Sequence, residues 1–417
     1  MNRKSLILYT AMLGLLTSLA LAAALQDTSA HPATAARPRA SAPADAGVAA
    51  DLPVLAYYYI WFDSQSWNRA KTDYPALGRY SSDDLQVMRD HIQWAKDAGI
   101  DGFIVSWKNT DKLSSRLKKL VTIANDEDFK LVIIYQGLDF ERDPLSIDTI
   151  GADLDYFEAT YGSSTVFDLF GQPSIIWSGT WEFSREEIAE VTVPRRDKMK
   201  ILASEKTVDG YLRLADIVDG NAYYWSSVNP DTQPGYGAKL QNMADAVHSH
   251  GGLWIAPAAP GFDARLVGGT RVVERDDGAT LDTQLKTALA SSPDAIGLIS
   301  WNEFSENSHI EPSCDHGTRY LQVIADLLGG TAPTNVDPCD VAKLDPATAT
   351  PEPGAVVAFE APVNDSGDFD SSSPGGTQGF GAFRALMFGL LAATVGASVA
   401  IVVRRSRTHT AYRSLEV

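Results

Sequence analysis

The chain has 417 residues, among which 53 acidic side chains outnumber 35 basic ones and give a formal net charge of −18. A surface this negative disfavours polyanionic partners, so we expect no nucleic acid to bind. Nine Trp and fifteen Tyr residues are a mild indication of sugar binding, because aromatic rings stack on sugars as well as filling cores.

The N-terminus has the pattern of a secretory signal peptide. Two basic residues precede an apolar run over 6–19, and small residues alternate up to Ala24. This pattern predicts cleavage after a signal of residues 1–25, with an uncleaved anchor as the alternative. Residues 26–50 are rich in Ala, Pro, Ser and Thr and are predicted to be a linker.

A second uncharged apolar stretch covers residues 385–403. At ~1.5 Å per residue it is long enough to cross a hydrocarbon core of about 30 Å. Arginines cluster in residues 404–417, so we expect this tail to be cytoplasmic and the body of the chain extracellular, held at the cell membrane by one span. The Pro-, Ser- and Gly-rich residues 331–384 before the span are predicted to be a flexible stalk.

Residues 51–330 alternate short apolar runs with amphipathic stretches. The candidate strands are residues 54–60, 102–107, 131–135, 174–177, 200–203, 217–224, 253–257 and 295–301. The candidate helices are residues 83–98, 111–127, 146–160, 185–190, 211–216, 236–250, 280–291 and 318–328. Eight such alternations predict an α/β fold, a closed (β/α)₈ barrel of the TIM type.

The two cysteines, Cys314 and Cys339, lie late in the body. In an oxidising compartment they are expected to form a disulfide that contributes ~3 kcal/mol, with two free thiols as the alternative. We found no His or Cys spacing typical of a metal site, so no metal is expected.

In such barrels the active site lies at the carboxyl ends of the strands. These ends are rich in aromatic and polar residues, which suits an extended sugar. The candidate substrate-binding residues are Tyr58, Tyr59, Trp61, Trp107, Gln136, Tyr223, Tyr224, Asn302 and His309. Because side chains alternate along a strand, one of Tyr58 and Tyr59, and one of Tyr223 and Tyr224, is expected to reach the site. The alternative for the tyrosines and tryptophans is core packing.

Two carboxylates, Glu303 and Glu306, follow the eighth candidate strand. Glycoside cleavage needs one group that donates a proton and one that accepts a proton or stabilises positive charge. Neighbouring carboxyls can divide these roles because each ionised group raises the pKa of the other. A solvated loop pair is the alternative for this spacing.

The segment 301–312 resembles the signature of glycoside hydrolase family 99, the endo-α-mannosidases and their bacterial relatives. The matching residues are Asn302, Glu303, Glu306, Ile310 and Glu311, whereas Phe304, Ser305, Asn307, Ser308 and His309 differ. Further similarities follow in order along residues 52–312, including 78–83, 105–107, 171–173 and 260–263.

The resemblance implies a retaining α-mannosidase in which the sugar's own 2-hydroxyl attacks the anomeric carbon. Glu303 would deprotonate that hydroxyl, and Glu306 would protonate the leaving oxygen and then activate water. This chemistry implies no metal and no organic cofactor. The expected partner is a polysaccharide or oligosaccharide.

One departure leaves the substrate open. The family often has a Glu near the end of its third strand, where this chain reads Tyr135-Gln136-Gly137. The motif is also similar to that of the α-1,3-glucanase family 71, so an α-glucan hydrolase is an alternative. Two others are a non-catalytic glycan-binding barrel at the cell surface and an accessory domain of a glycan synthase.

Overall fold

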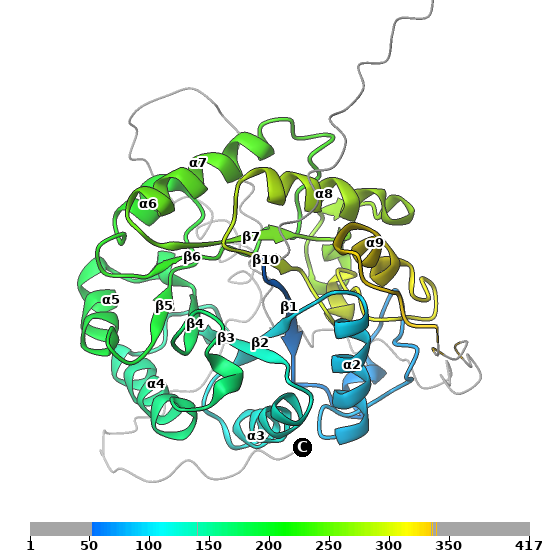
Figure 1. The fold of residues 1–417 in the computed structure, drawn as a ribbon, viewed down its shortest axis with the longest axis horizontal. Coiled ribbons are helices and arrows are strands. Elements are labelled where there is room, and N and C mark those ends of the chain that lie inside the picture. Colours follow the sequence, from blue (N-terminus) through cyan, green and yellow to red (C-terminus); the bar gives the residue numbers. More distant parts are fainter. Residues whose placement is uncertain (1–51, 140, 335, 337–338, 340–417) are drawn as a thin grey trace, which may run out of the picture. The chain divides into compact units, whose positions relative to one another are not determined.

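The computed structural model describes residues 52–139, 141–334, 336 and 339, and these form a ring of parallel strands inside a ring of helices (Figure 1). The strands of the inner ring are β1 (Val54–Tyr59), β2 (Gly102–Trp107), β3 (Lys130–Gln136), β4 (Ser174–Ser178), β5 (Lys200–Leu202), β6 (Gly220–Asn221), β7 (Leu253–Ala258) and β10 (Ala295–Leu298). All eight predicted strands are therefore present, and the prediction of a (β/α)₈ barrel is confirmed.

The strand order shows how the barrel closes. The sheet runs β5-β4-β3-β2-β1-β10-β7-β6, so β5 and β6 are its two ends. A parallel bridge between Ala203 and Asn221 joins these ends. Ala203 N donates to Gly220 O, and Ala222 N donates to Ala203 O, both at 2.9 Å. The ring is thus continuous. The junction of β5 and β6, which we call the seam, has the fewest paired residues of any two neighbouring strands.

Eight helices cover the outside of the barrel in the described part of the chain (Figure 1). They are α2 (Leu85–Asp97), α3 (Asp111–Asp126), α4 (Ile147–Tyr161), α5 (Arg185–Thr192), α6 (Val208–Leu212), α7 (Tyr236–Ser249), α8 (Ala279–Ala290) and α9 (Arg319–Leu328). Capping side chains fix several helix starts: Asp84 accepts hydrogen bonds from the first turn of α2, and Ser184 forms a capping box at α5.

Two predicted strands are shorter than expected by three residues or more. The run 217–224 forms a strand only at β6, because Gly220 packs so tightly against β7 that an added Cβ would lie 2.1 Å from Leu253 O, and the chain turns at Trp225. The run 295–301 ends at Leu298, because the following residues pair with the returning loop: Ser300 N donates to Ser308 O at 2.7 Å.

Two small additions lie between β7 and α8. β8 (Phe262–Asp263) and β9 (Val272–Val273) form an antiparallel pair that the sequence did not predict.

Short 3-10 turns occupy several loops: η1 (Ser66–Asn68), η2 (Thr165–Phe167), η3 (Thr180–Glu182), η4 (Val193–Arg195), η5 (Ala264–Val267), η6 (Asp276–Gly278) and η7 (Phe304–Glu306). Of the two predicted catalytic glutamates, Glu303 caps the start of η7 and Glu306 is its last residue.

The predicted disulfide is present between Cys314 and Cys339. The first residues of the predicted stalk pack on the barrel, because Thr331 N donates to Asp97 O at 2.6 Å and Ala332 is buried. Within the part of the chain that the structure describes, no helix combines the length and apolar character of a membrane span. The predicted signal peptide (1–25), linker (26–50), most of the stalk, the span (385–403) and the tail (404–417) lie outside the described residues.

Candidate active site

Side-chain alternation along β1 divides its tyrosines between two environments. Tyr57 packs inside the barrel with Leu55 and Ile104. Tyr58 packs outside it, stacked on Phe103 at 4.4 Å between ring centroids. The next residue, Tyr59, again faces inward, and its hydroxyl donates to that of Tyr224 at 2.9 Å. One member of each predicted tyrosine pair therefore reaches the mouth of the barrel, as expected from a period of two.

Asn302 fastens the loop after β10 to the end of β1. Its side-chain oxygen accepts from Tyr59 N at 2.9 Å, and its amide donates to Tyr59 O at 3.0 Å. These two hydrogen bonds fix the backbone next to Glu303. A third, from Glu303 N to Ser300 Oγ at 2.8 Å, holds Glu303 itself. Asn302 is fully buried and acts on the backbone, so its role in the structure is to position the loop rather than to contact substrate.

Glu303 is buried at the start of η7. Burial raises the pKa of its carboxyl to about 7, while the hydrogen bond from Ser305 N, at 2.8 Å, and the charge of Lys71 act in the opposite direction. A carboxyl with a pKa near neutrality exchanges its proton readily at physiological pH.

Glu306 is buried at the end of the same turn. Burial is the main reason that the pKa of Tyr224 lies well above its ordinary value, and the negative charge of Glu306 is the next. Glu303 and Glu306 also raise the pKa of Tyr59, after burial and Tyr224 itself. The two glutamates therefore lie close enough to the Tyr59–Tyr224 pair for their charges to act on it, and we call these four residues the inner cluster.

A second polar group lies on the outer side of the same strand ends. Tyr58 OH lies 3.0 Å from His91 Nδ1, and His91 Nε2 lies 3.0 Å from Glu311 Oε1. The other carboxylate oxygen, Glu311 Oε2, accepts from Tyr80 OH at 2.9 Å. We call Tyr58, His91, Glu311 and Tyr80 the outer network. All four are buried and bonded to one another, which indicates a structural role.

Two other predicted residues lie at the mouth. Trp61 is half-buried and its ring lies 4.1 Å from that of Tyr59. Gln136 is half-buried at the end of β3 and donates to Ser106 Oγ at 3.0 Å. Both remain candidates for contact with a sugar.

Four predicted substrate-binding residues lie elsewhere, and for these the prediction is corrected. Tyr58 and Tyr223 belong to the outer core because alternation turns them away from the mouth. Trp107 is fully buried beside Phe157, between β2 and α4, so it packs the barrel rather than forming a platform. His309 is fully buried, and its Nε2 lies 3.1 Å from Asp73 Oδ2.

Lys71 is a residue that sequence reasoning missed. It lies in the loop between η1 and α2, half-buried, and its pKa is lowered mainly by burial while the charge of Glu303 acts in the opposite direction. This loop has no periodic pattern, so only the three-dimensional structure reveals that a cation lies close to Glu303.

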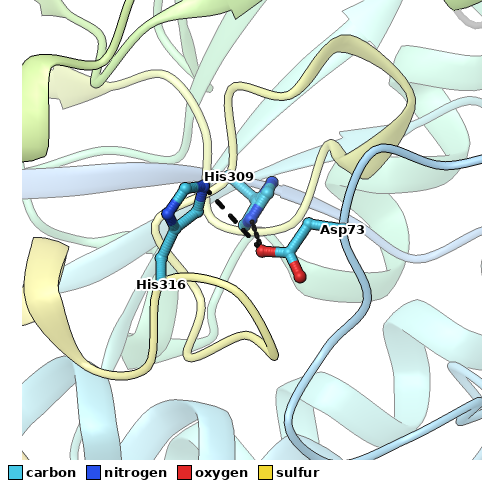
Figure 2. Close-up of side chains that lie close together, drawn as sticks. All are labelled: Asp73, His309 and His316. Carbon is cyan, nitrogen blue, oxygen red and sulfur yellow. Dashed lines mark hydrogen bonds and ion pairs between the residues drawn. The ribbon is translucent and has the colours of Figure 1, made fainter. Parts of the chain in front are cut away.

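The structure also brings Asp73, His309 and His316 together, although 236 residues separate the first two (Figure 2). Their side-chain ligand atoms lie within 4.8 Å of one another, and among the described residues this is the group whose composition could hold a metal ion. Sequence spacing gave no signal for it because the ligands come from two distant loops.

Comparison with known proteins found one informative curated relative. A glycoprotein endo-α-1,2-mannosidase-like protein from Homo sapiens is 23% identical over 269 residues, which cover 57% of this chain and 56% of that protein. The chain thus spans little more than half the length of that relative. No family model matches the sequence.

Solved structures agree with this relationship. The GH99 endo-α-mannosidase from Bacteroides thetaiotaomicron, in two structures of which one is a complex with bis-tris-propane, superimposes with a TM-score of 0.58. The identities are 21% and 20%, and the match covers 66% of this chain and 96% of that one. A glycoside hydrolase-like protein gives a TM-score of 0.54 at 16% identity, over 67% of this chain. The predicted resemblance to the endo-α-mannosidases is therefore confirmed, along the sequence by the human relative and in the fold by the solved structures.

Proposed function

We propose that this chain is a glycoside hydrolase that cleaves α-linked mannosides. The observation that carries the proposal is the inner cluster: two buried carboxylates, Glu303 and Glu306, face a tyrosine pair where the eighth barrel strand ends. Binding a sugar alone would not require two buried carboxylates, because burying charge without a catalytic gain destabilises a protein. The resemblance to the endo-α-mannosidases supports the choice of sugar.

The proposed reaction retains anomeric configuration through the substrate's 2-hydroxyl. Glu303 takes the proton of that hydroxyl while its oxygen attacks the anomeric carbon, and Glu306 gives a proton to the departing glycosidic oxygen. Water then opens the resulting 1,2-anhydro ring: Glu306 takes a proton from the water, and Glu303 returns its proton to the 2-oxygen. The pKa of about 7 for Glu303 suits a base that must both accept and return a proton.

The tyrosine pair has a supporting role in this reaction. The pKa values of Tyr59 and Tyr224 lie well above the ordinary value, so both hydroxyls stay protonated. Tyr59 OH donates to Tyr224 OH at 2.9 Å, so it is the proton of Tyr224 that can be donated to a carboxylate or to a sugar oxygen. Positive charge from Lys71 stabilises the ionised form of Glu303 when the base is free.

Gln136 favours a second candidate, an α-glucan hydrolase. It takes the place at the end of β3 where the endo-α-mannosidases often have a carboxylate, and here it hydrogen-bonds to Ser106. A neutral amide would recognise sugar hydroxyls without preferring the mannose arrangement. Both candidates share the inner cluster but not the same first step. In an α-glucoside the 2-hydroxyl is cis to the leaving oxygen and cannot attack the anomeric carbon from the opposite face, so there Glu303 would act as the nucleophile or as the base for a water molecule. The choice of polymer in one assay distinguishes the two candidates.

We also propose that the enzyme works outside the cell, anchored by one C-terminal span with the tail in the cytoplasm. The sequence patterns at the two ends support this arrangement. The Cys314–Cys339 disulfide is consistent with an oxidising compartment.

The test is product release from a panel of α-mannans and α-glucans by the full-length chain, beside Glu303→Gln and Glu306→Gln. We expect short oligosaccharides from one polymer class and a loss of at least about 100-fold in kcat/KM for each variant. Glu274→Gln, at an exposed glutamate, is the matched control and should keep full activity. If no polymer is cut and all four proteins bind one polymer equally, the barrel is a lectin and the proposal is wrong.

The pH profile adds an independent readout. The groups that face Glu303 are Lys71, Ser305 N and, through the tyrosine pair, Glu306. Because Glu303 must be ionised to act as the base, kcat/KM should rise with pH to a limb near pH 7, the pKa of this carboxyl. Lys71→Met removes a charge that lowers this pKa, so the limb should move to higher pH.

A further inference from the structure

Three side chains from the loops beside the barrel mouth converge on one point (Figure 2). Asp73 precedes α2, His309 follows η7, and His316 precedes α9. Asp73 Oδ2 lies 3.1 Å from His309 Nε2 and 3.9 Å from His316 Nε2. All three ligand atoms lie within 4.8 Å of one another. One carboxylate and two imidazoles therefore point their ligand atoms into the same small volume.

These distances match the spacing of ligands around a zinc-class ion. Bonds of about 2.0–2.1 Å in a tetrahedron place neighbouring ligand atoms about 3.3 Å apart. The two distances from Asp73 Oδ2, 3.1 and 3.9 Å, lie on either side of this value. The third pair, the ligand nitrogens of the two imidazoles, lies within 4.8 Å, so a bound ion would draw the two rings toward each other.

The backbone already orients Asp73 for such a role. Its other oxygen, Oδ1, accepts from Tyr74 N at 2.7 Å and from Asp315 N at 3.0 Å. Oδ2 is left facing the two imidazoles. Hydrogen bonds of this kind to the outer oxygen are what fixes a ligating carboxylate in known metal sites.

The two loops that carry the ligands are also tied to each other. Cys314 N donates to Tyr74 O at 2.8 Å, and Pro75 forms an antiparallel bridge with Ser313. The Cys314–Cys339 disulfide adds a covalent link two residues from His316. The positions of Asp73 and His316 are thus set before any ion binds, which reduces the entropic cost of binding.

The charged and polar groups around the site influence its affinity for an ion. His309 is fully buried, and Nδ1 of its ring has no hydrogen-bond partner in the described structure. The buried Arg275 is held by Asn307 Oδ1 at 3.1 Å, by His309 O and by the ring of Tyr320. Its positive charge offsets that of Asp73 and should make the affinity moderate.

We infer that Asp73, His309 and His316 bind one divalent ion of the zinc class, with water in the fourth position on the half-exposed side of His316. Nitrogen ligands favour zinc over magnesium or calcium, which prefer oxygen. The ring of His309 stacks on Phe304 at 4.0 Å, in the turn between Glu303 and Glu306. The ion therefore stabilises the loop that carries the inner cluster, and its role is structural because its contact with that loop is through the ring of Phe304. The inference does not depend on the proposed hydrolase activity.

The test is a calorimetric titration of zinc into the full-length chain, purified without a histidine tag and treated with a chelator. We expect one ion per chain, no comparable binding of magnesium, and a rise in Tm of about 5 °C at a zinc concentration 100 times Kd. A cobalt titration should give the visible absorption of a four-coordinate ion. Absence of stoichiometric zinc binding, or equal binding of magnesium, would overturn the inference.

The variants Asp73→Asn and His316→Ala assign the site. Each should weaken zinc binding at least about 100-fold, beyond the loss expected for an outer-shell partner. His248→Ala is the matched control, because His248 also lies 3.0 Å from a carboxylate, that of Asp294, without a second imidazole. His316 is half-exposed, and circular dichroism checks that its variant is folded. Zinc affinity that survives in both folded variants contradicts the assignment.

Discussion

The inner cluster and the outer network each combine glutamate with tyrosine, each include a tyrosine of β1 and a glutamate from the loop after β10, and are both buried, yet their carboxylates are held differently. In the outer network each oxygen of Glu311 has its own side-chain partner, His91 or Tyr80. In the inner cluster Glu303 accepts a hydrogen bond from one backbone N–H, and burial raises its pKa to about 7. A buried carboxyl with a side-chain partner on each oxygen stabilises the fold, whereas one whose partners do not offset the effect of burial is available for chemistry.

The largest effect that would sharpen this comparison is on stability. His91→Leu removes the partner of both Tyr58 and Glu311 and leaves a buried carboxylate with one side-chain hydrogen bond. We expect the free energy of unfolding to fall by about 3–5 kcal/mol, the range for breaking a buried pair by removing one partner. Urea denaturation of the full-length chain measures it. A loss below ~1 kcal/mol would show that the outer network does not fasten the fold.

In the inner cluster, removing the carboxylate of Glu303 should raise the free energy of unfolding instead of lowering it. The folded-state pKa of Glu303, about 7, lies above its ordinary value of 4.5, so the folded protein binds this proton more tightly than the unfolded chain does. Its contribution to stability is present below pH 4.5 and is lost as the pH rises through 7. Glu303→Gln abolishes this loss, so the variant should exceed the wild type by on the order of 3 kcal/mol at pH 8.

The measurement is urea denaturation of both proteins at pH 5 and pH 8, with Glu274→Gln as the control at an exposed site. The advantage of Glu303→Gln should be small at pH 5 and should grow toward pH 8. An advantage that is equal at both pH values would mean that the carboxyl is not destabilised by burial.

The smallest effect comes from two neighbouring tyrosines. Tyr59→Phe removes the hydrogen bond to Tyr224 in the inner cluster, whereas Tyr58→Phe removes the one to His91 in the outer network. The first should lower kcat/KM about tenfold with little change in stability; the second should lower stability by about 1–2 kcal/mol with kcat/KM unchanged. Equal effects of the two variants on both measurements would erase the distinction between the two regions.

Much of the fold could be predicted because each strand and helix has its own local signal. Apolar runs such as 102–107 and amphipathic stretches such as 111–127 specify their elements within one or two residues. The run 217–224 shows the limit of this reasoning. Its apolar residues read as one strand, but contact with β7 and the turn at Trp225 reduce it to Gly220–Asn221. Tertiary contacts decided that boundary, and no local pattern records them.

The candidate site divides in the same way. The glutamates could be located from their place after the eighth strand, and alternation predicted that one tyrosine of each pair faces inward, though not which one. Lys71 and the Asp73–His309–His316 group could not be found, because their loops lack periodicity and their partners are more than 200 residues away. Trp107 was misplaced for a related reason: a tryptophan at a strand end fits the mouth and the outer core equally well until the facing is known.

The seam of the barrel has a consequence for motion. Six positions of β2 pair with β3, whereas β6 pairs with β7 at two positions and meets β5 through a single bridge. Amide hydrogens at this seam should exchange with solvent through local openings of lower free energy than those of β1 to β3. Tyr224 directly follows β6, while its partner Tyr59 ends the well-paired β1. Tyr224 is therefore carried by the part of the ring in which local opening is expected to need the least free energy.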